Sequence, residues 1–360
     1  MTRYLDVQHM RQLCAHVGIA ELLRRMEAAI EADFRRWPEF EKSARVARYT
    51  REGVIELMPV ADARHFSFKY VNGHPGNPRH NLPTVMAFGV LSDMRTGDPL
   101  LLSELTLTTA LRTAATSVLA ARWLARREAR CMAIIGNGAQ SEFQALAFMT
   151  LLGVRALRLY DIDPAAMRKL ADNLSTVCAA SGTQEPDIRL CGSAREAAAG
   201  ADIVTTLTAA QVCAQVLTLD MLTLGTHVNA VGGDSPGKTE LHRDILKNSK
   251  VFVEYLPQTR VEGEIQQIPE LNPPELWNVL NKTHPGRTSE DDITVFDSVG
   301  FALEDFSALR VLFELSNRLE IGSELDLIAA PDSPKNLFSL LCHAPSEPSP
   351  DKAFALTPCM

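Results

Sequence analysis

A glycine-rich turn between a short apolar strand and a helix is the feature that most constrains how this chain folds. Residues 131–135 (CMAII) predict a buried strand, and residues 136–141 (GNGAQS) follow it at the start of a predicted helix over 139–152. Gly136 permits a tight turn, and Gly138 lets a pyrophosphate approach the N–H groups at the helix start. Ser141 stands where a third glycine or alanine is usual, so the packing of helix on strand must accept a hydroxyl. The turn predicts a dinucleotide-binding unit.

An acidic residue follows the next predicted strand, at residues 156–160. Asp161 lies about 20 residues beyond the turn, where a carboxylate commonly binds ribose hydroxyls. Such a carboxylate accepts hydrogen bonds from the 2′- and 3′-hydroxyls of adenosine and repels a 2′-phosphate. The sequence therefore predicts NAD rather than NADP as the cofactor.

The surrounding sequence alternates short apolar strands with helices, which is typical of a parallel sheet built from βαβ units. We expect strands at 131–135, 156–160, 188–191, 203–207, 227–231, 251–254 and 293–296, and helices at 139–152, 164–181, 194–199, 241–248 and 301–319. The prediction is an α/β fold in which residues 125–318 form a Rossmann-type, doubly wound NAD-binding domain.

Residues 1–124 follow a different pattern, with two amphipathic helices between residues 6 and 37 and a long helix at 106–126. Between the helices, short alternating runs predict antiparallel hairpins at 45–49, 54–60, 66–71, 85–91 and 100–102. We expect a mixed α+β substrate-binding and dimerisation domain, to which residues 319–343 return, and a flexible tail at 344–360. The edge strands of this domain need covering, and pairing with the same region of a second subunit would cover them. We therefore expect a homodimer.

Composition narrows the choice of partners. The 360 residues include 44 acidic and 36 basic side chains, and the net charge of −8 disfavours contact with nucleic-acid phosphates and anionic membranes. No apolar run approaches the roughly 18 residues of a membrane-spanning helix, and the seven scattered cysteines fit a reducing cytoplasm. His74 and His80 lack the spacing of a zinc site. We expect a cytoplasmic protein without metal, membrane or nucleic-acid partners.

One acidic residue lies among glycines. Asp234 belongs to segment 229–240 (NAVGGDSPGKTE), which begins at the carboxyl end of a predicted parallel strand, the edge where open α/β sheets bind ligands. Glycines beside a single carboxylate suggest a backbone that lets it approach a substrate. A polar turn capped by Asp234 explains the same residues equally well.

Charged residues also interrupt the apolar segments of the N-terminal half. Glu56 lies in a predicted strand on the face of Met58, Lys69 lies in another strand opposite the aromatic residues, Arg112 lies in the long helix, and Arg45 begins a strand. Cations that converge from different elements would hold a carboxylate, which arginine can grip through two hydrogen bonds. Each cation taken alone is better explained by a solvent-facing position.

Several runs of residues resemble the ornithine cyclodeaminase and μ-crystallin family. They are KSARVA (42–47), VIELMP (54–59), FKYVNGHP (68–75), TVM (84–86), ALRT (110–113), GNGAQS (136–141), VGGD (231–234), GKTE (237–240) and VFDS (295–298). The resemblance extends from about residue 4 to about residue 340. It implies that L-ornithine is converted into L-proline and ammonia, with tightly held NAD as a temporary hydride store.

The resemblance also implies roles for individual residues. Arg45, Lys69 and Arg112 would hold the substrate α-carboxylate, while Asp234 would be the catalytic acid and base and Glu56 would contact the substrate amines as the second catalytic carboxylate. The cofactor contacts that it implies are Thr84, Gly136, Asn137, Gly138, Ala139, Gln140, Ser141, Asp161, Thr206, Val231, Gly232, Lys238 and Ser298.

Three other activities remain open. A lysine cyclodeaminase would handle a substrate longer by one methylene, which changes binding by only about 1–3 kcal/mol. An NAD(P)-dependent ketimine reductase or amino-acid dehydrogenase would release its product without closing a ring, and the pairing of Glu56 with Asp234 favours a diamine instead. A non-enzymatic binding protein like the μ-crystallins fits less well, because binding alone needs no base beside the nicotinamide.

Overall fold

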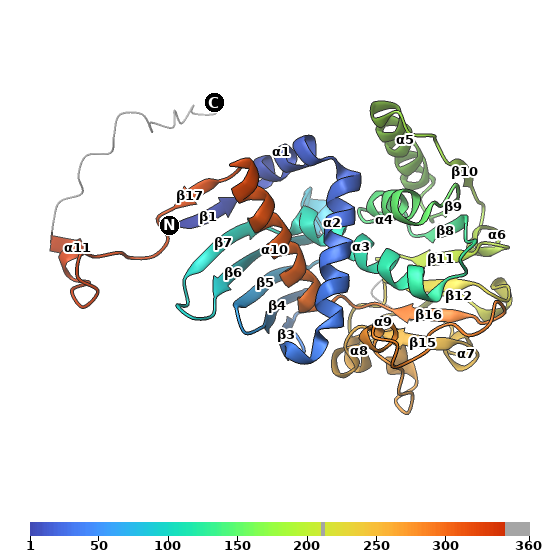
Figure 1. Cartoon of the computed structure of the whole chain (residues 1–360). Helices are drawn as coiled ribbons and strands as arrows, with labels where there is room; N and C mark the ends of the chain where they lie inside the picture. The colour runs from blue at the N-terminus through green and yellow to red at the C-terminus, as the bar shows by residue number, and fades with distance from the viewer. Residues whose placement is uncertain (210–212, 343–360) are drawn as a thin grey trace.

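The computed structural model describes residues 1–209 and 213–342 and contains two large sheets side by side (Figure 1). The predicted tail at 344–360 lies outside the described residues. None of the described helices is long and apolar enough to cross a membrane.

One sheet has seven parallel strands in the order β10-β9-β8-β11-β13-β16-β15. In chain order they are β8 (Cys131–Ile135), β9 (Ala156–Tyr160), β10 (Asp187–Leu190), β11 (Ile203–Thr206), β13 (His227–Ala230), β15 (Lys250–Val253) and β16 (Thr294–Asp297). The strand order reverses between β8 and β11, as in doubly wound folds. The predicted Rossmann-type class is therefore confirmed. The central strands β11, β13 and β16 are buried throughout because both faces of the sheet are covered there, whereas the edge strand β10 is mostly exposed.

The helices of this half are mostly short. They are α4 (Ser141–Ala147), the π-helix η3 (Phe148–Leu152), α5 (Pro164–Ser181), α6 (Ala194–Ala198), α7 (Arg243–Lys247), α8 (Leu256–Glu262) and α9 (Leu276–Leu280), with 3-10 turns η4 (Leu219–Met221) and η5 (Glu264–Gln267). The helix expected at 139–152 starts two residues later, because Ala139 and Gln140 complete the turn. The helix expected at 241–248 starts at Arg243, since β14 (Thr239–Leu241) pairs with β12 (Cys213–Leu217) in a small third sheet.

The second large sheet has the order β17-β1-β7-β6-β5-β4-β2, with β3 paired to β4. Its strands are β1 (Thr2–Leu5), β2 (Glu41–Lys42), β3 (Val46–Tyr49), β4 (Val54–Ala61), β5 (His65–Gly73), β6 (Val85–Asp93), β7 (Pro99–Glu104) and β17 (Ser323–Leu325). The predicted antiparallel hairpins are confirmed. Three strands were not expected: β1 runs parallel to β7, β2 pairs with β4, and β17 pairs with β1 as the chain returns.

Long helices cover one face of this second sheet. They are α1 (Val7–Val17), α2 (Ile19–Arg35), α3 (Thr106–Leu124) and α10 (Ala302–Leu319). The remaining short helices of this half are η1 (Trp37–Glu39), η2 (Asn77–His80) and α11 (Ser339–Cys342), and α11 lies apart from the helical layer (Figure 1). Gly18, at φ +82°, separates α1 from α2, the two amphipathic helices expected between residues 6 and 37. Figure 1 shows α2 and α10 crossing the sheet, so α10 carries residues from the end of β16 to the strands β4 and β5.

Candidate active site

The glycine turn has the conformation that the sequence predicted. Gly136 has φ +93°, and a Cβ atom there would lie 2.8 Å from the backbone of Leu207, so only glycine fits without strain. A Cβ atom on Gly138 would meet nothing within 4 Å, so that side of the turn is open. The Ser141 hydroxyl donates a hydrogen bond of 2.7 Å to the Gly138 carbonyl, which explains how the packing tolerates serine at this position.

Asp161, the carboxylate predicted to bind the ribose, lies beside the glycine turn. One carboxylate oxygen of Asp161 accepts a hydrogen bond of 2.5 Å from the N–H of Asn137, and the other accepts one of 2.9 Å from the N–H of Asp163. Within the described residues, the buried side-chain oxygens of Asn137 and Gln140 have no hydrogen-bond partner. An open glycine face, two unbonded amide oxygens and a carboxylate at one strand edge fit a dinucleotide.

The other residues with predicted cofactor contacts mostly follow strands of the same sheet. Thr206 ends β11, Val231 and Gly232 follow β13, and Ser298 follows β16. The carboxyl ends of parallel strands meet at one edge, so these residues share the edge of the glycine turn. Thr84 differs, because it precedes β6 in the other sheet, where its carbonyl accepts a hydrogen bond from His74.

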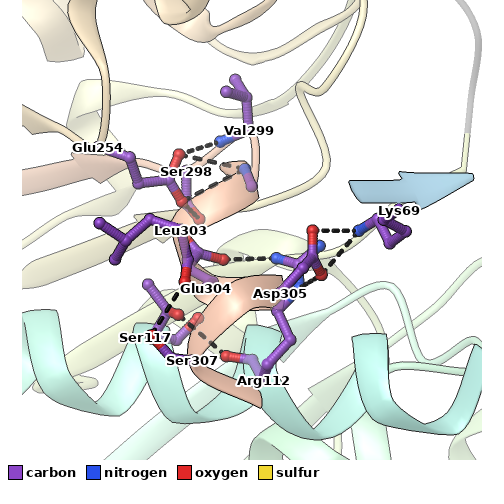
Figure 2. A network of polar contacts seen from close by, with 12 residues as sticks. Lys69, Arg112, Ser117, Glu254, Ser298, Val299, Leu303, Glu304, Asp305 and Ser307 are labelled. Carbon is purple, nitrogen blue, oxygen red and sulfur yellow. Dashed lines mark hydrogen bonds and ion pairs between the residues drawn. The ribbon is translucent and has the colours of Figure 1, made fainter. Parts of the chain in front are cut away.

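A buried group of charges connects the antiparallel sheet to α10 (Figure 2). Asp305 lies between two cations, at 2.9 Å from Nζ of Lys69 and 3.0 Å from Nε of Arg112. The Nη1 atom of Arg112 donates a further bond of 2.6 Å to Glu304. Burial, reinforced by the nearby Arg112, lowers the pKa of Lys69 to about 8. The reading of Lys69 and Arg112 as solvent-facing side chains is wrong, since both are buried.

Sequence analysis missed the carboxylates that complete this group. Glu304 and Asp305 lie in the first turn of α10, and Glu254 follows β15. Glu254 accepts hydrogen bonds from the Ser298 hydroxyl at 2.6 Å and from the N–H groups of Val299 and Gly300, and it shares a side-chain hydrogen bond with Glu304. Burial raises the pKa of Glu254 and of Glu304, so this pair tends to keep a proton.

Arg45 lies between two further carboxylates. Its Nη1 atom is 3.0 Å from Glu56 and its Nε atom is 3.1 Å from Glu262, while Nη2 donates to the carbonyls of Val299 and Gly300 at 2.6 Å each. The Arg45 side chain is 7% exposed. Burial opposes its charge, but Glu56 and Glu262 outweigh burial and raise the pKa of Arg45. Glu56 faces inward with Met58, as the alternation in β4 predicted.

Asp234 has a more open position than the other charged residues of the site. Its side chain is 51% exposed and forms an ion pair of 2.9 Å with Nζ of Lys238, which is itself nearly buried. Asp234 also acts electrostatically on Arg45 and on Glu262, raising the pKa of both. The structure therefore brings Asp234 to the side of the site where Arg45, Glu56 and Glu262 meet.

Metal ligands do not gather here. In residues 1–209 and 213–342 no group of three or more histidine, cysteine, aspartate or glutamate side chains could hold a metal ion. The arrangement instead offers fixed cations for an anionic group and several carboxylates for amines, both at the edge of a dinucleotide-binding turn.

Comparisons with known proteins identify relatives over nearly the whole chain. Residues 7–318 match the family described as "Ornithine cyclodeaminase/mu-crystallin family". An ornithine cyclodeaminase of Brucella suis is 54% identical over 339 residues, which cover 94% of this chain and 93% of the relative. A solved structure of a lysine cyclodeaminase that recognises L-lysine, L-ornithine and L-2,4-diaminobutyric acid is 31% identical, with a TM-score of 0.84 over 92% of this chain and 97% of its own. An archaeal alanine dehydrogenase dimer with bound NAD is 29% identical, with a TM-score of 0.80 over 91% and 99%.

Proposed function

The chain belongs to the ornithine cyclodeaminase/mu-crystallin family, and we propose how its site performs the reaction named for the Brucella relative. It is an NAD-dependent ornithine cyclodeaminase, an ammonia-lyase that converts L-ornithine into L-proline and ammonia. The observation that carries this conclusion is the pairing of a buried cation group with a carboxylate-lined region at the edge of the glycine turn. A diamine that is also an amino acid needs both.

The glycine turn and Asp161 hold the cofactor in this proposal. NAD, when bound, supplies the acceptor that takes a hydride from the substrate carbon and later returns it. We propose that residues 136–141 bind the pyrophosphate, that Asp161 binds the adenosine ribose, and that the remaining cofactor contacts lie toward the nicotinamide. Those remaining contacts are Thr84, Thr206, Val231, Gly232, Lys238 and Ser298.

The cation group binds the α-carboxylate of the substrate. Asp305 holds Lys69 and Arg112 side by side, so that their remaining N–H donors can meet one carboxylate. Arg45 adds positive charge from the other side of the site. Because these side chains are already fixed by the protein, binding the substrate costs little further ordering.

Asp234 acts as the base and acid beside the reacting carbon. It takes the proton of the α-ammonium, because hydride departure requires a neutral amine, and it returns a proton to the departing nitrogen. Its exposure lets it exchange protons with water between turnovers. Glu56 contacts the substrate amines. Ring closure joins two ends of one bound molecule, so proximity favours it strongly.

The domain organisation, the oligomeric state and the cellular location complete the proposal. We propose that residues 1–124 with 319–343 form the substrate-binding and dimerisation domain, that residues 125–318 form the NAD-binding domain, and that the protein is a cytoplasmic homodimer. Support comes from the outer face of the antiparallel sheet, where large apolar side chains of β4 and β6 are exposed and Tyr70 stacks on Phe88 at 5.0 Å. An exposed apolar face of this kind is typical of an interface, and the alanine dehydrogenase of similar structure is a dimer.

The test is incubation of the protein with L-ornithine and catalytic NAD while proline and ammonia are followed together. We expect both products in equal amounts and no net consumption of NAD. A parallel reaction with L-lysine measures the second candidate substrate, because the lysine cyclodeaminase of similar structure recognises L-lysine as well as L-ornithine. Formation of a keto acid with stoichiometric reduced cofactor would instead identify an amino-acid dehydrogenase.

A further inference from the structure

The proposed reaction requires two protons to be held at the same time. Ornithine binds with an α-ammonium and a δ-ammonium, and each nitrogen must lose a proton, the first before hydride departure and the second before it attacks the imine carbon. Ornithine as a monocation yields zwitterionic proline and one ammonium ion, so both protons return by the end of the cycle. A single carboxylate binds one proton, so Asp234 alone cannot hold both.

Glu262 has the geometry of a second proton acceptor. It is the last residue of α8, its side chain is 4% exposed, and its Oε1 atom accepts a hydrogen bond of 3.2 Å from the Tyr49 hydroxyl. Its Oε2 atom lies 3.1 Å from Nε of Arg45, but among the described residues no group donates a hydrogen bond to it with good geometry. A buried carboxylate oxygen without a donor is unfavourable unless a ligand supplies one.

The charges around Glu262 set its proton affinity. The titratable groups that face it are Arg45, which precedes β3, Tyr49 on β3, Glu56 on β4 and Asp234 after β13. Burial is the largest effect and, together with Glu56 and Asp234, raises the pKa of Glu262 to about 7, although Arg45 and Tyr49 act in the opposite direction. The carboxyl group can therefore gain and lose a proton near neutral pH, which suits an acid–base group.

We propose that Glu262 accepts the proton of the substrate δ-ammonium, an inference that rests on the proposed function. The N–H bond breaks and its electron pair stays on nitrogen, while an O–H bond forms at Oε2. The neutral δ-amine can then attack the imine carbon. Asp234 returns its proton to the departing nitrogen, which leaves as ammonia and takes a further proton from the ring nitrogen. After the hydride returns, Glu262 gives its proton to the amine of proline, so no oxidant or other co-reactant is needed. Glu56 is less suited, because its Oε2 atom already accepts a hydrogen bond from Arg45.

The main test compares Glu262→Gln with the unaltered protein. We expect turnover to fall by roughly 10²–10⁴, as when acid–base catalysis is lost. Mixing the variant with NAD and L-ornithine should still produce a burst of reduced-cofactor absorbance, because the α-amine step uses Asp234. Proline formation should then rise about tenfold for each pH unit up to about pH 8, because the δ-ammonium, with a lysine-like pKa of about 10.4, must ionise without help. Above that pH the rise should stop, because Lys69 loses its proton.

A matched control separates catalysis from stability. Glu27 on α2 is also a 4% exposed carboxylate paired with an arginine, at 2.5 Å from Nη1 of Arg122, and burial raises its pKa. Glu27→Gln should lower the melting temperature while turnover and its pH dependence stay unchanged. Glu262→Gln should keep NAD binding.

The outcomes distinguish the inference from the proposed function. If the unaltered protein makes no proline from L-ornithine, the proposed function fails. If it makes proline and Glu262→Gln has the same turnover and pH profile, or is inactive without any reduced-cofactor burst, the role of Glu262 is wrong.

A second variant keeps the inference testable even if Glu262→Gln does not fold. Tyr49 is half exposed, so Tyr49→Phe should fold. Loss of its hydrogen bond removes an effect that lowers the pKa of Glu262. In the pH profile of kcat, the acidic limb should therefore move to higher pH. An acidic limb at the same pH as in the unaltered protein would overturn the inference.

Discussion

The two ends of the site differ in how their charges are held. At the α10 end, Lys69 and Arg112 are buried and bonded to Asp305, so their positions are set by the protein before any substrate arrives. At the other end, Asp234 is half exposed and its ion pair is with the nearby Lys238. Burying charges is costly and is sustained only by good partners, whereas a half-exposed carboxylate can exchange protons with water. The difference separates a rigid anchor from an acid–base group.

The largest expected effect is at the exposed end. Asp234→Asn keeps the shape of the side chain but removes its proton-accepting form, so turnover should fall by roughly 10²–10⁴ while NAD still binds. Mixing this variant with NAD and ornithine should give no reduced-cofactor absorbance. Asp244→Asn, at an equally exposed site, is the control and should keep full activity. Accumulation of reduced cofactor in Asp234→Asn would show that Asp234 acts in a step after hydride transfer.

The next effect is at the anchored end. Arg112→Lys replaces the two-donor guanidinium by a single ammonium. The loss of one charge-assisted bond to the substrate carboxylate, worth about 1.5–3 kcal/mol, should raise KM for ornithine roughly 10- to 150-fold. Arg310→Lys, a change of the same kind on α10 at a partly exposed ion pair with Asp33, should leave KM unchanged. An unchanged KM in Arg112→Lys would show that Arg112 does not bind the substrate carboxylate.

A smaller effect should appear in the pH dependence of kcat/KM. Lys69 can bind a carboxylate only when protonated, and its pKa of about 8 makes activity fall about tenfold per unit above that pH. Glu262 must be ionised to accept a proton, and its pKa of about 7 makes activity fall below that pH. We expect a narrow maximum between the two values, measured at constant ionic strength. A flat profile from about pH 6 to 9 would contradict both assignments.

The smallest effect concerns the cofactor. Asp161→Ser removes the charge that repels a 2′-phosphate, and the loss of one exposed hydrogen bond of about 1 kcal/mol should weaken NAD binding roughly fivefold. The preference for NAD over NADP should narrow, which titration of both cofactors by intrinsic fluorescence can measure. Equal affinity of the unaltered protein for the two cofactors would show that Asp161 does not select between them.

Local patterns predicted the backbone of the site better than its charge partners. The bounds of β8 and β9 were predicted to the residue, and alternation correctly placed Glu56 on the face of Met58. Lys69 was expected to face solvent and is buried instead. Glu304 and Asp305 escaped notice because acidic residues in the first turn of a helix are common at solvent-exposed helix starts. Their partners Lys69 and Arg112 are about 190 or more residues away in the sequence, so only the packing of α10 on the sheet reveals the contact.

The shortest elements also escaped prediction. Strands β1 and β17 have four and three residues, too few for a periodic pattern to emerge. Strand β1 is defined by its pairing with β7 and β17, and β17 is defined by its pairing with β1. Glu262 ends a helix of seven residues that sequence analysis did not anticipate. The roles of the cofactor-contact residues stay predictions, because they depend on where the bound molecules lie.

The tripeptide 298–300 limits how the molecule can open to admit its ligands. Its Val299 and Gly300 carbonyls hold Arg45 from the antiparallel half, and its N–H groups are held by Glu254 from the parallel half. Separating the halves here would break two charge-assisted bonds, at a cost of about 1.5–3 kcal/mol each. The tripeptide therefore ties the two halves together beside the site and opposes their separation at this point.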